Sequence, residues 1–205
     1  MTIPAGRGAL TVLFALTLTG ACSRLSLRRQ PAAEDHQAPH PVVIIDTSMG
    51  RIEVELWPDK TPATVENFLT YVDERYYDGL VFHRVIRDFM IQGGGFTPDL
   101  RHREARAPIL NEARADAPNI RGTIAMARTR RVHSATSQFF INLAENDHLN
   151  HRDGTARQFG YCVFGIVTSG LEVADRIGGM PTENRNGFAN APVTPVIINK
   201  IRRRR

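Results

Sequence analysis

Residues 41–202 are predicted to form one mainly β domain in which short strands outnumber helices. The segment contains many apolar or alternating runs of strand length, separated by turn residues. Only two short stretches show the 3.6-residue apolar period of a helix. Many short strands with two isolated helices suggest a closed antiparallel barrel, although periodicity alone leaves a sandwich open.

Six strands follow from the pattern, and the second alternates apolar and acidic residues, so one of its faces should be wet. They are expected at 42–45, 52–57, 123–127, 138–142, 161–167 and 193–201.

The first helix should start at Thr61, a suitable N-cap, with Pro62 at the first helical position. Its apolar stripe consists of Val65, Phe68, Leu69 and Val72. The second helix is expected over 171–177, where Gly178-Gly179 ends it.

The charge of the chain is concentrated near its C-terminus. The chain has 205 residues, 42% of them hydrophobic, and a formal net charge of +5. Without Arg7 and the five cations within 200–205 the charge is −1. This near-neutral body does not imply a nucleic-acid partner. The basic tail, residues 203–205, is expected to be a solvated, frayed end, and contact with anionic lipid headgroups is the alternative.

The N-terminus is predicted to be a secretory signal peptide, residues 1–21. An uncharged run over 8–18 is too short to span a membrane and fits the apolar region of such a signal. Small residues before Cys22 resemble a lipobox, which would make Cys22 the lipidated first residue; ordinary cleavage after Ala21 is the alternative. Residues 22–40 are predicted to be a flexible tether.

These features predict a location in the bacterial cell envelope. The protein would be periplasmic and anchored to a membrane through acylated Cys22. Stable anchoring would require two or more acyl chains on this residue. Ser23 is not an acidic retention residue, so the outer membrane is favoured over the inner one.

No cofactor or metal is expected. No zinc, P-loop or dinucleotide fingerprint is present in the sequence. His36 and His40 could be ligands four residues apart on a helix, but Pro39 and Pro41 favour a solvated linker. Cys162 is interpreted as a small core residue rather than a redox group.

The most informative runs are Phe82–Ile86, Phe89–Gly94 and, about fifty residues later, Ser137–Asn142. They place an arginine and two glutamines among large apolar residues, where an unpaired charge is costly. These runs resemble the active-site strands of a cyclophilin, a peptidyl-prolyl cis-trans isomerase. The resemblance covers about residues 41–202 and implies an eight-stranded barrel capped by two helices.

The resemblance implies a catalytic role for Arg84, Gln92 and Phe89. Isomerisation of an X–Pro bond breaks no covalent bond, so the enzyme must hold proline and favour the twisted amide. A fixed donor aimed at the prolyl nitrogen does this, and the guanidinium of Arg84 suits the role. Gln92 matches the glutamine that orients this arginine. The alternative is a structural Arg84 paired with a nearby carboxylate.

The remaining site residues are expected to bind substrate. Phe89, Met90, Phe140 and Leu149 match the walls of the proline pocket, although each taken singly is more often plain core. The other predicted binding residues are Ala127, Arg128 and Thr129, whose backbone would pair with the residues preceding proline, and Gln138, His148 and Tyr161. Arg128 stands where asparagine is common and would add a charge preference.

Three residues and one loop have further features of note. His148 stands where many eukaryotic members have a tryptophan that binds cyclosporin, so weak cyclosporin binding with intact activity is expected. Gly95 stands where the family usually has aspartate. His83 should point away from Arg84 by strand alternation, as a satisfied structural histidine. The polar loop 150–158 should border the groove.

The sequence thus predicts an exported, monomeric prolyl isomerase whose partners are proline-containing unfolded or partly folded envelope proteins. A non-catalytic chaperone that binds proline segments and an envelope scaffold are the alternatives.

Overall fold

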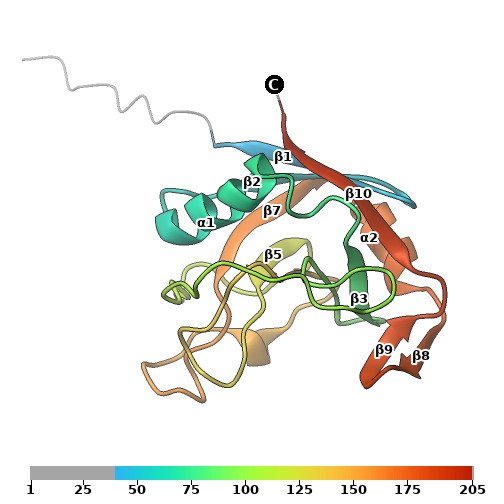
Figure 1. Ribbon diagram of the computed structural model, residues 1–205. Coiled ribbons are helices and arrows are strands. Elements are labelled where there is room, and N and C mark those ends of the chain that lie inside the picture. The colour runs from blue at the N-terminus through green and yellow to red at the C-terminus, as the bar shows by residue number, and fades with distance from the viewer. Residues whose placement is uncertain (1–39, 205) are drawn as a thin grey trace, which may run out of the picture. The chain divides into compact units, whose positions relative to one another are not determined.

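The computed structural model describes residues 40–204, and these residues form a closed eight-stranded barrel (Figure 1). Every strand pair in the barrel is antiparallel, as expected. Around the barrel the strands follow the order β1 (Val42–Thr47), β10 (Val196–Arg203), β3 (Val81–Ile86), β4 (Met90–Gly93), β6 (Phe139–Asn142), β5 (Thr123–Met126), β7 (Val163–Ser169) and β2 (Gly50–Leu56). The predicted signal peptide, Cys22 and the tether up to Pro39 lie outside the described residues.

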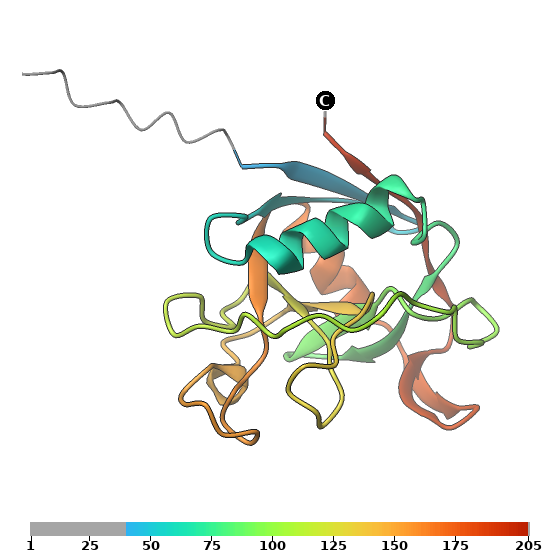
Figure 2. The same cartoon turned by 60° about the vertical axis from the view of Figure 1, so that its left-hand side comes forward.

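Two α-helices pack on the barrel, α1 (Pro62–Asp73) and α2 (Leu171–Gly178) (Figure 2). The predicted stripe of α1 is buried. Thr61 is the N-cap residue and Pro62 the first helical residue, as predicted, but the Thr61 hydroxyl makes no capping hydrogen bond and donates to the carbonyl of Trp57 at 3.3 Å. The carboxylate of Glu112 instead accepts the N–H groups of Ala63 and Thr64, at 3.2 and 2.7 Å. A residue 48 positions away thus caps this helix.

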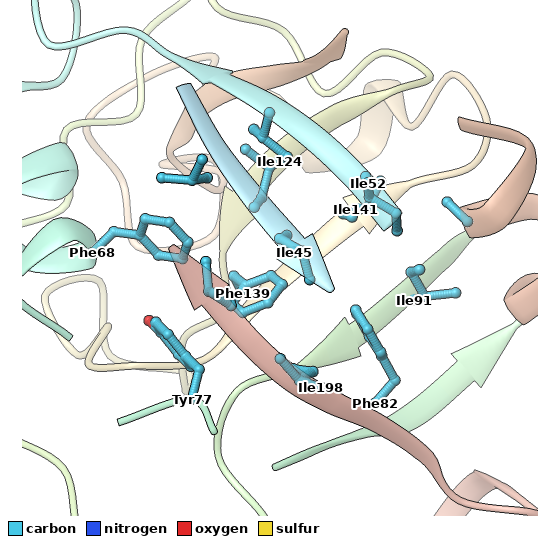
Figure 3. Close-up of a cluster of buried hydrophobic side chains, with 14 of the residues drawn as sticks. Ile45, Ile52, Phe68, Tyr77, Phe82, Ile91, Ile124, Phe139, Ile141 and Ile198 are labelled. Carbon is cyan, nitrogen blue, oxygen red and sulfur yellow. The ribbon is translucent and has the colours of Figure 1, made fainter. Parts of the chain in front are cut away.

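The barrel interior is filled by aliphatic and aromatic side chains from every side (Figure 3). Ile45, Ile52, Ile91 and Ile141 are fully buried there. Phe139 is met edge-on by the ring of Phe68 from α1, with centroids 5.7 Å apart. The interior is a packed core rather than a channel, so a ligand must bind elsewhere.

The sequence suggested a frayed basic tail over 203–205, but Arg203 and Arg204, the residues of that tail that the structure describes, are ordered against β1. Arg202 and Arg203 belong to β10 and pair with Ile44 and Val43 of β1, and the N–H of Arg204 donates to Val42 at 2.7 Å. Their guanidiniums form ion pairs across the surface, Arg202 with Asp78, Arg203 with Asp73 and Arg204 with Glu53. The segment is therefore part of the seam between β1 and β10.

The folded domain also includes His40, one residue before its predicted start. His40, predicted to be the last residue of the tether, contacts the carboxylates of Glu55 and Asp59 with its two ring nitrogens, at 3.1 and 3.0 Å. These contacts place His40 in the folded domain rather than in a solvated linker. Within residues 40–204 no helix has the length and apolarity needed to cross a membrane.

A two-stranded hairpin outside the barrel was not predicted. It consists of β8 (Thr182–Arg185) and β9 (Phe188–Pro192). Strand β8 is polar throughout and β9 is too short to give a clear alternation, but the turn holds Asn186-Gly187, both at positive φ, which is a strong hairpin signal. The hairpin lies beside β3, where Phe188 packs on Phe96 with ring centroids 4.8 Å apart (Figure 1).

Candidate active site

The candidate site begins as one row of residues across neighbouring strands on the outside of the barrel. Arg84 of β3 pairs with Gln92 of β4, Gln92 with Phe140 of β6, and Phe140 with Ala125 of β5. Paired residues of antiparallel strands point to the same face of a sheet. The row therefore sets a guanidinium, an amide and an aromatic ring side by side.

A bulge in β3 sets the direction of Arg84. Between Phe82 and Arg84 the pairing with β4 shifts register, which leaves His83 as an extra residue. Because of this bulge Phe82 faces the core while Arg84, two residues later, faces the outer groove. Bulges of this kind re-aim side chains next to functional sites.

As expected, His83 does not line the groove. Contrary to expectation, the hydrogen-bonding groups of its ring are not all satisfied. Its side chain is buried against Phe96 and Phe188, and its Nδ1 has no hydrogen-bond partner within residues 40–204. Burial lowers the pKa of His83 from 6.5 to about 4, so the ring is neutral at pH 7.

An apolar pocket of about 120 Å³ opens beside Arg84. Its floor and walls are a small hydrophobic cluster separate from the barrel core, in which the rings of Phe140 and Tyr161 meet edge-on at 5.7 Å. The pocket is lined by Arg84, Phe89, Met90, Gln92, Ala127, Arg128, Phe140, Leu149 and Tyr161. The structure thus brings nine of the twelve predicted catalytic and binding residues into a single pocket.

Gln138, Thr129 and His148 lie around this pocket. Gln138 and Thr129 line an adjoining groove of about 430 Å³, which shares Gln92, Ala127 and Arg128 with the pocket. The ring of His148 stacks on Phe89 at 5.4 Å and 28°. The predicted effect of His148 on cyclosporin binding stays a prediction.

Arg84 is a cation whose charge is not neutralised by a neighbour. Its only side-chain hydrogen bond within residues 40–204 is from Nη1 to Oε1 of Gln92, at a long 3.4 Å. No carboxylate of this part of the chain forms an ion pair with it, which excludes a structural Arg84–carboxylate pair there. Its remaining donors are available to a group bound in the pocket.

The segment 127–129 offers backbone groups to an extended peptide. The N–H of Ala127 is used by the carbonyl of Gln138, at 2.9 Å, and the N–H of Thr129 by Oγ of Ser134, at 3.0 Å. Within residues 40–204 neither the N–H nor the C=O of Arg128 has a partner. A peptide lying in the groove can pair with both groups, as a strand would.

A network of buried asparagines holds the pocket walls, and sequence reasoning missed it. Asn146 donates from Nδ2 to the carbonyl of Phe89 at 2.9 Å and to Oδ1 of Asn142 at 2.7 Å. Asn119 donates to the carbonyl of Leu149 at 3.1 Å and receives a bond from Asn142 at 3.3 Å. Asn150 joins them, since its Oδ1 accepts the backbone N–H of Asn119 at 2.6 Å. Four asparagines within 32 residues are a weak signal in the sequence, and only folding shows that all four meet.

Cys162 is a core residue, as predicted. Its side chain is buried, and Sγ lies 3.4 Å from Oγ1 of Thr64. Burial raises its pKa from 9.0 to about 12, so it is a neutral thiol at pH 7. Such a thiol is a poor nucleophile and is not part of the site.

The geometry defines a class of protein: one that holds a small apolar ring beside a fixed guanidinium donor, with backbone groups for the adjoining peptide. Residues 42–203 match the family described as cyclophilin type peptidyl-prolyl cis-trans isomerase. The chain belongs to this family, and it is a peptidyl-prolyl cis-trans isomerase.

Similar proteins of known sequence and structure support this assignment to the family. The chain is 53% identical over 156 residues to peptidyl-prolyl cis-trans isomerase cyp18 of Streptomyces antibioticus, which covers 76% of this chain and 94% of the relative. It is 45% identical over 160 residues to peptidyl-prolyl cis-trans isomerase B of Escherichia coli, covering 78% and 98%. A cyclophilin type isomerase of Cryptosporidium parvum superposes with a TM-score of 0.70 at 25% identity, covering 81% and 98%.

Proposed function

We propose that this isomerase acts on exported proteins of a bacterial cell envelope, to which it is anchored through acylated Cys22. The observation that carries the proposal is the N-terminal sequence, in which an uncharged apolar run over 8–18 is followed by Gly20-Ala21-Cys22. This arrangement fits a secretory signal that ends in a lipidated cysteine.

The arrangement of the catalytic domain supports this proposal. In Figure 1 the first strand, β1, begins at one end of the barrel, whereas the loops that follow β5 and β6 lie at the other end. Those loops carry Arg128 and Leu149 of the proline pocket. The groove therefore lies at the end of the barrel opposite the start of β1, so the entry of the N-terminal segment into the domain leaves it open.

The clients would be proline-containing segments of unfolded or partly folded proteins. Uncatalysed X–Pro isomerisation takes about 10–100 s at 25 °C, long enough to delay folding after export. An open groove next to the pocket suits an extended chain better than a folded surface.

Mass spectrometry of the mature N-terminus, from the full chain expressed in a Gram-negative host, tests the anchoring. The proposal expects a chain that starts at Cys22, carries acyl groups and sediments with membranes, and expects the C22A variant to lose the acyl groups. A soluble wild-type chain that starts at Cys22 without acylation, or that retains residues 1–21 in the cytoplasm, would overturn it.

A further inference from the structure

The proline pocket continues, past Leu149 and Tyr161, into a second surface depression. This open depression has a volume of about 620 Å³. It is lined by Arg128, Thr129, Arg130, His148, Leu149, Ala156, Arg157 and Tyr161, and we call it the basic hollow. It shares Arg128, Leu149 and Tyr161 with the proline pocket, so a peptide held by its proline can extend into it.

The charged side chains that line the basic hollow are all cationic. Arg128, Arg130 and Arg157 contribute guanidiniums, and no carboxylate of residues 40–204 lines the hollow. None of the three arginines forms an ion pair with a carboxylate within residues 40–204. Nine other arginines of the same region do form such pairs, among them Arg106 with Glu74 and Arg121 with Asp175.

Arg128 is held in place by neutral groups. Its guanidinium lies over the ring of Tyr161, 4.7 Å from the centroid, and donates to the carbonyls of Gly160 and Thr129 at 3.0 and 3.1 Å. These contacts fix the position of the cation without cancelling its charge. Part of the entropy cost of binding an anion is therefore already met in the free protein.

The groove on the other side of the pocket has a different balance of charge. It is lined by Glu104 and by Arg106, whose charge is matched by Glu74. Among the described residues, and apart from Arg128, which borders both depressions, that side presents one carboxylate and no unmatched arginine. A bound peptide therefore meets positive charge on one side of its proline and a mixed surface on the other.

We propose that the basic hollow is a subsite for an acidic side chain of the client. The enzyme then prefers X–Pro segments with an aspartate or glutamate on one particular side of the proline. Guanidiniums pair well with carboxylates, and a charge-lined depression raises the local concentration of the opposite charge. This inference rests on the isomerase activity of the adjoining pocket and is independent of the proposed export.

The experiment measures isomerisation of single-proline peptides by NMR exchange with the full domain. One residue at a time, before or after the proline, is Glu, Gln or Lys. For wild type we expect one position at which kcat/KM follows Glu, then Gln, then Lys, with Glu over Lys by about three- to tenfold at low salt. At about 0.5 M salt, where the Debye length is about 4 Å, the ratio should approach one.

Two variants connect the preference to the hollow. The double variant R130Q/R157Q should reduce the Glu-to-Lys ratio to below about twofold, whereas R152Q should keep it. Arg152 is an exposed arginine of the same loop as Arg157 that does not line the hollow, so it controls for the loss of a cation outside the hollow. Equal rates for Glu and Lys peptides at every position, or an unchanged ratio in R130Q/R157Q, would overturn the proposal. Failure of wild type to accelerate the Gln peptide would instead count against the isomerase activity itself.

Discussion

The side-chain amides of Gln92 and Gln138 are joined by a hydrogen bond from Nε2 to Oε1 at 3.0 Å. Because Nε2 of Gln92 is engaged there, its Oε1 faces the guanidinium of Arg84. Gln138 is the residue just before β6 and lies 46 positions after Gln92 in the chain. The orientation of Arg84, the predicted catalytic arginine, therefore depends on two amides from separate parts of the chain.

Gly95 leaves the space in which Gln138 sits, and its substitution should disturb this arrangement. A Cβ at Gly95 would lie 2.6 Å from Cγ and 2.7 Å from Nε2 of Gln138, which is closer than non-bonded atoms approach one another. We expect G95A to fold and to lose about three- to tenfold in kcat/KM, equivalent to about one kcal/mol, the size of one hydrogen bond. The matched control is G154A, since a Cβ at Gly154 meets nothing within 4 Å. Equal activity of the two variants in NMR exchange would contradict this role.

Replacement of Arg84 should separate catalysis from binding. R84A removes the guanidinium that we expect to donate to the prolyl nitrogen, and loss of one preorganised donor lowers kcat by about 10²–10³. The apolar pocket remains, so peptide binding, measured by NMR titration, should weaken much less. R87Q is the control, because Arg87 donates to the carbonyl of Gly179 and does not line the pocket. Retention of wild-type exchange rates in R84A would favour a role in binding alone.

Buried His83 should make the domain less stable in acid. Its pKa is about 4 in the folded protein and 6.5 in the unfolded chain, so folding favours the neutral ring. The stabilisation is complete above pH 6.5 and is lost as the pH falls from 6.5 toward 4, by about 3 kcal/mol in total. Urea unfolding of wild type and H83L between pH 7 and 4.5 measures this. The prediction requires a shallower pH dependence in H83L; parallel curves would contradict it.

Truncation should show that the C-terminal arginines matter through their backbone. Deleting residues 202–205 removes the rungs between β10 and β1 at Arg202 and Arg203, and we expect a loss of about 1–3 kcal/mol in the free energy of unfolding. The full-length R203Q variant keeps the rungs and loses only an exposed ion pair with Asp73, for which about 0–1 kcal/mol is typical. Urea unfolding compares the two. A truncated domain as stable as wild type would mean that the seam closes without these residues.

The sequence was sufficient to predict a mainly β domain because strands depend on local patterns, whereas the choice of a closed barrel over a sandwich rested on the resemblance to the family. Short alternating runs predict strands, and the motifs around Arg84, Gln92 and Phe140 have an order and spacing that chance rarely produces. Since β3, β4 and β6 are neighbours, their polar residues fall into one row. The pairing of Gln92 with Phe140 joins distant segments, so the family resemblance, and not the periodicity, placed these residues together.

Other features were decided only by tertiary structure, because they depend on contacts between segments far apart in the chain. Glu112 caps α1, the asparagines at 119, 142 and 146 hold the pocket walls, and the arginines of β10 find Asp78, Asp73 and Glu53. A polar or charged residue carries no periodic signal of its partner, so the sequence suggested a frayed tail. Apolar periodicity determines which face of an element is buried, and folding alone determines which polar groups meet there.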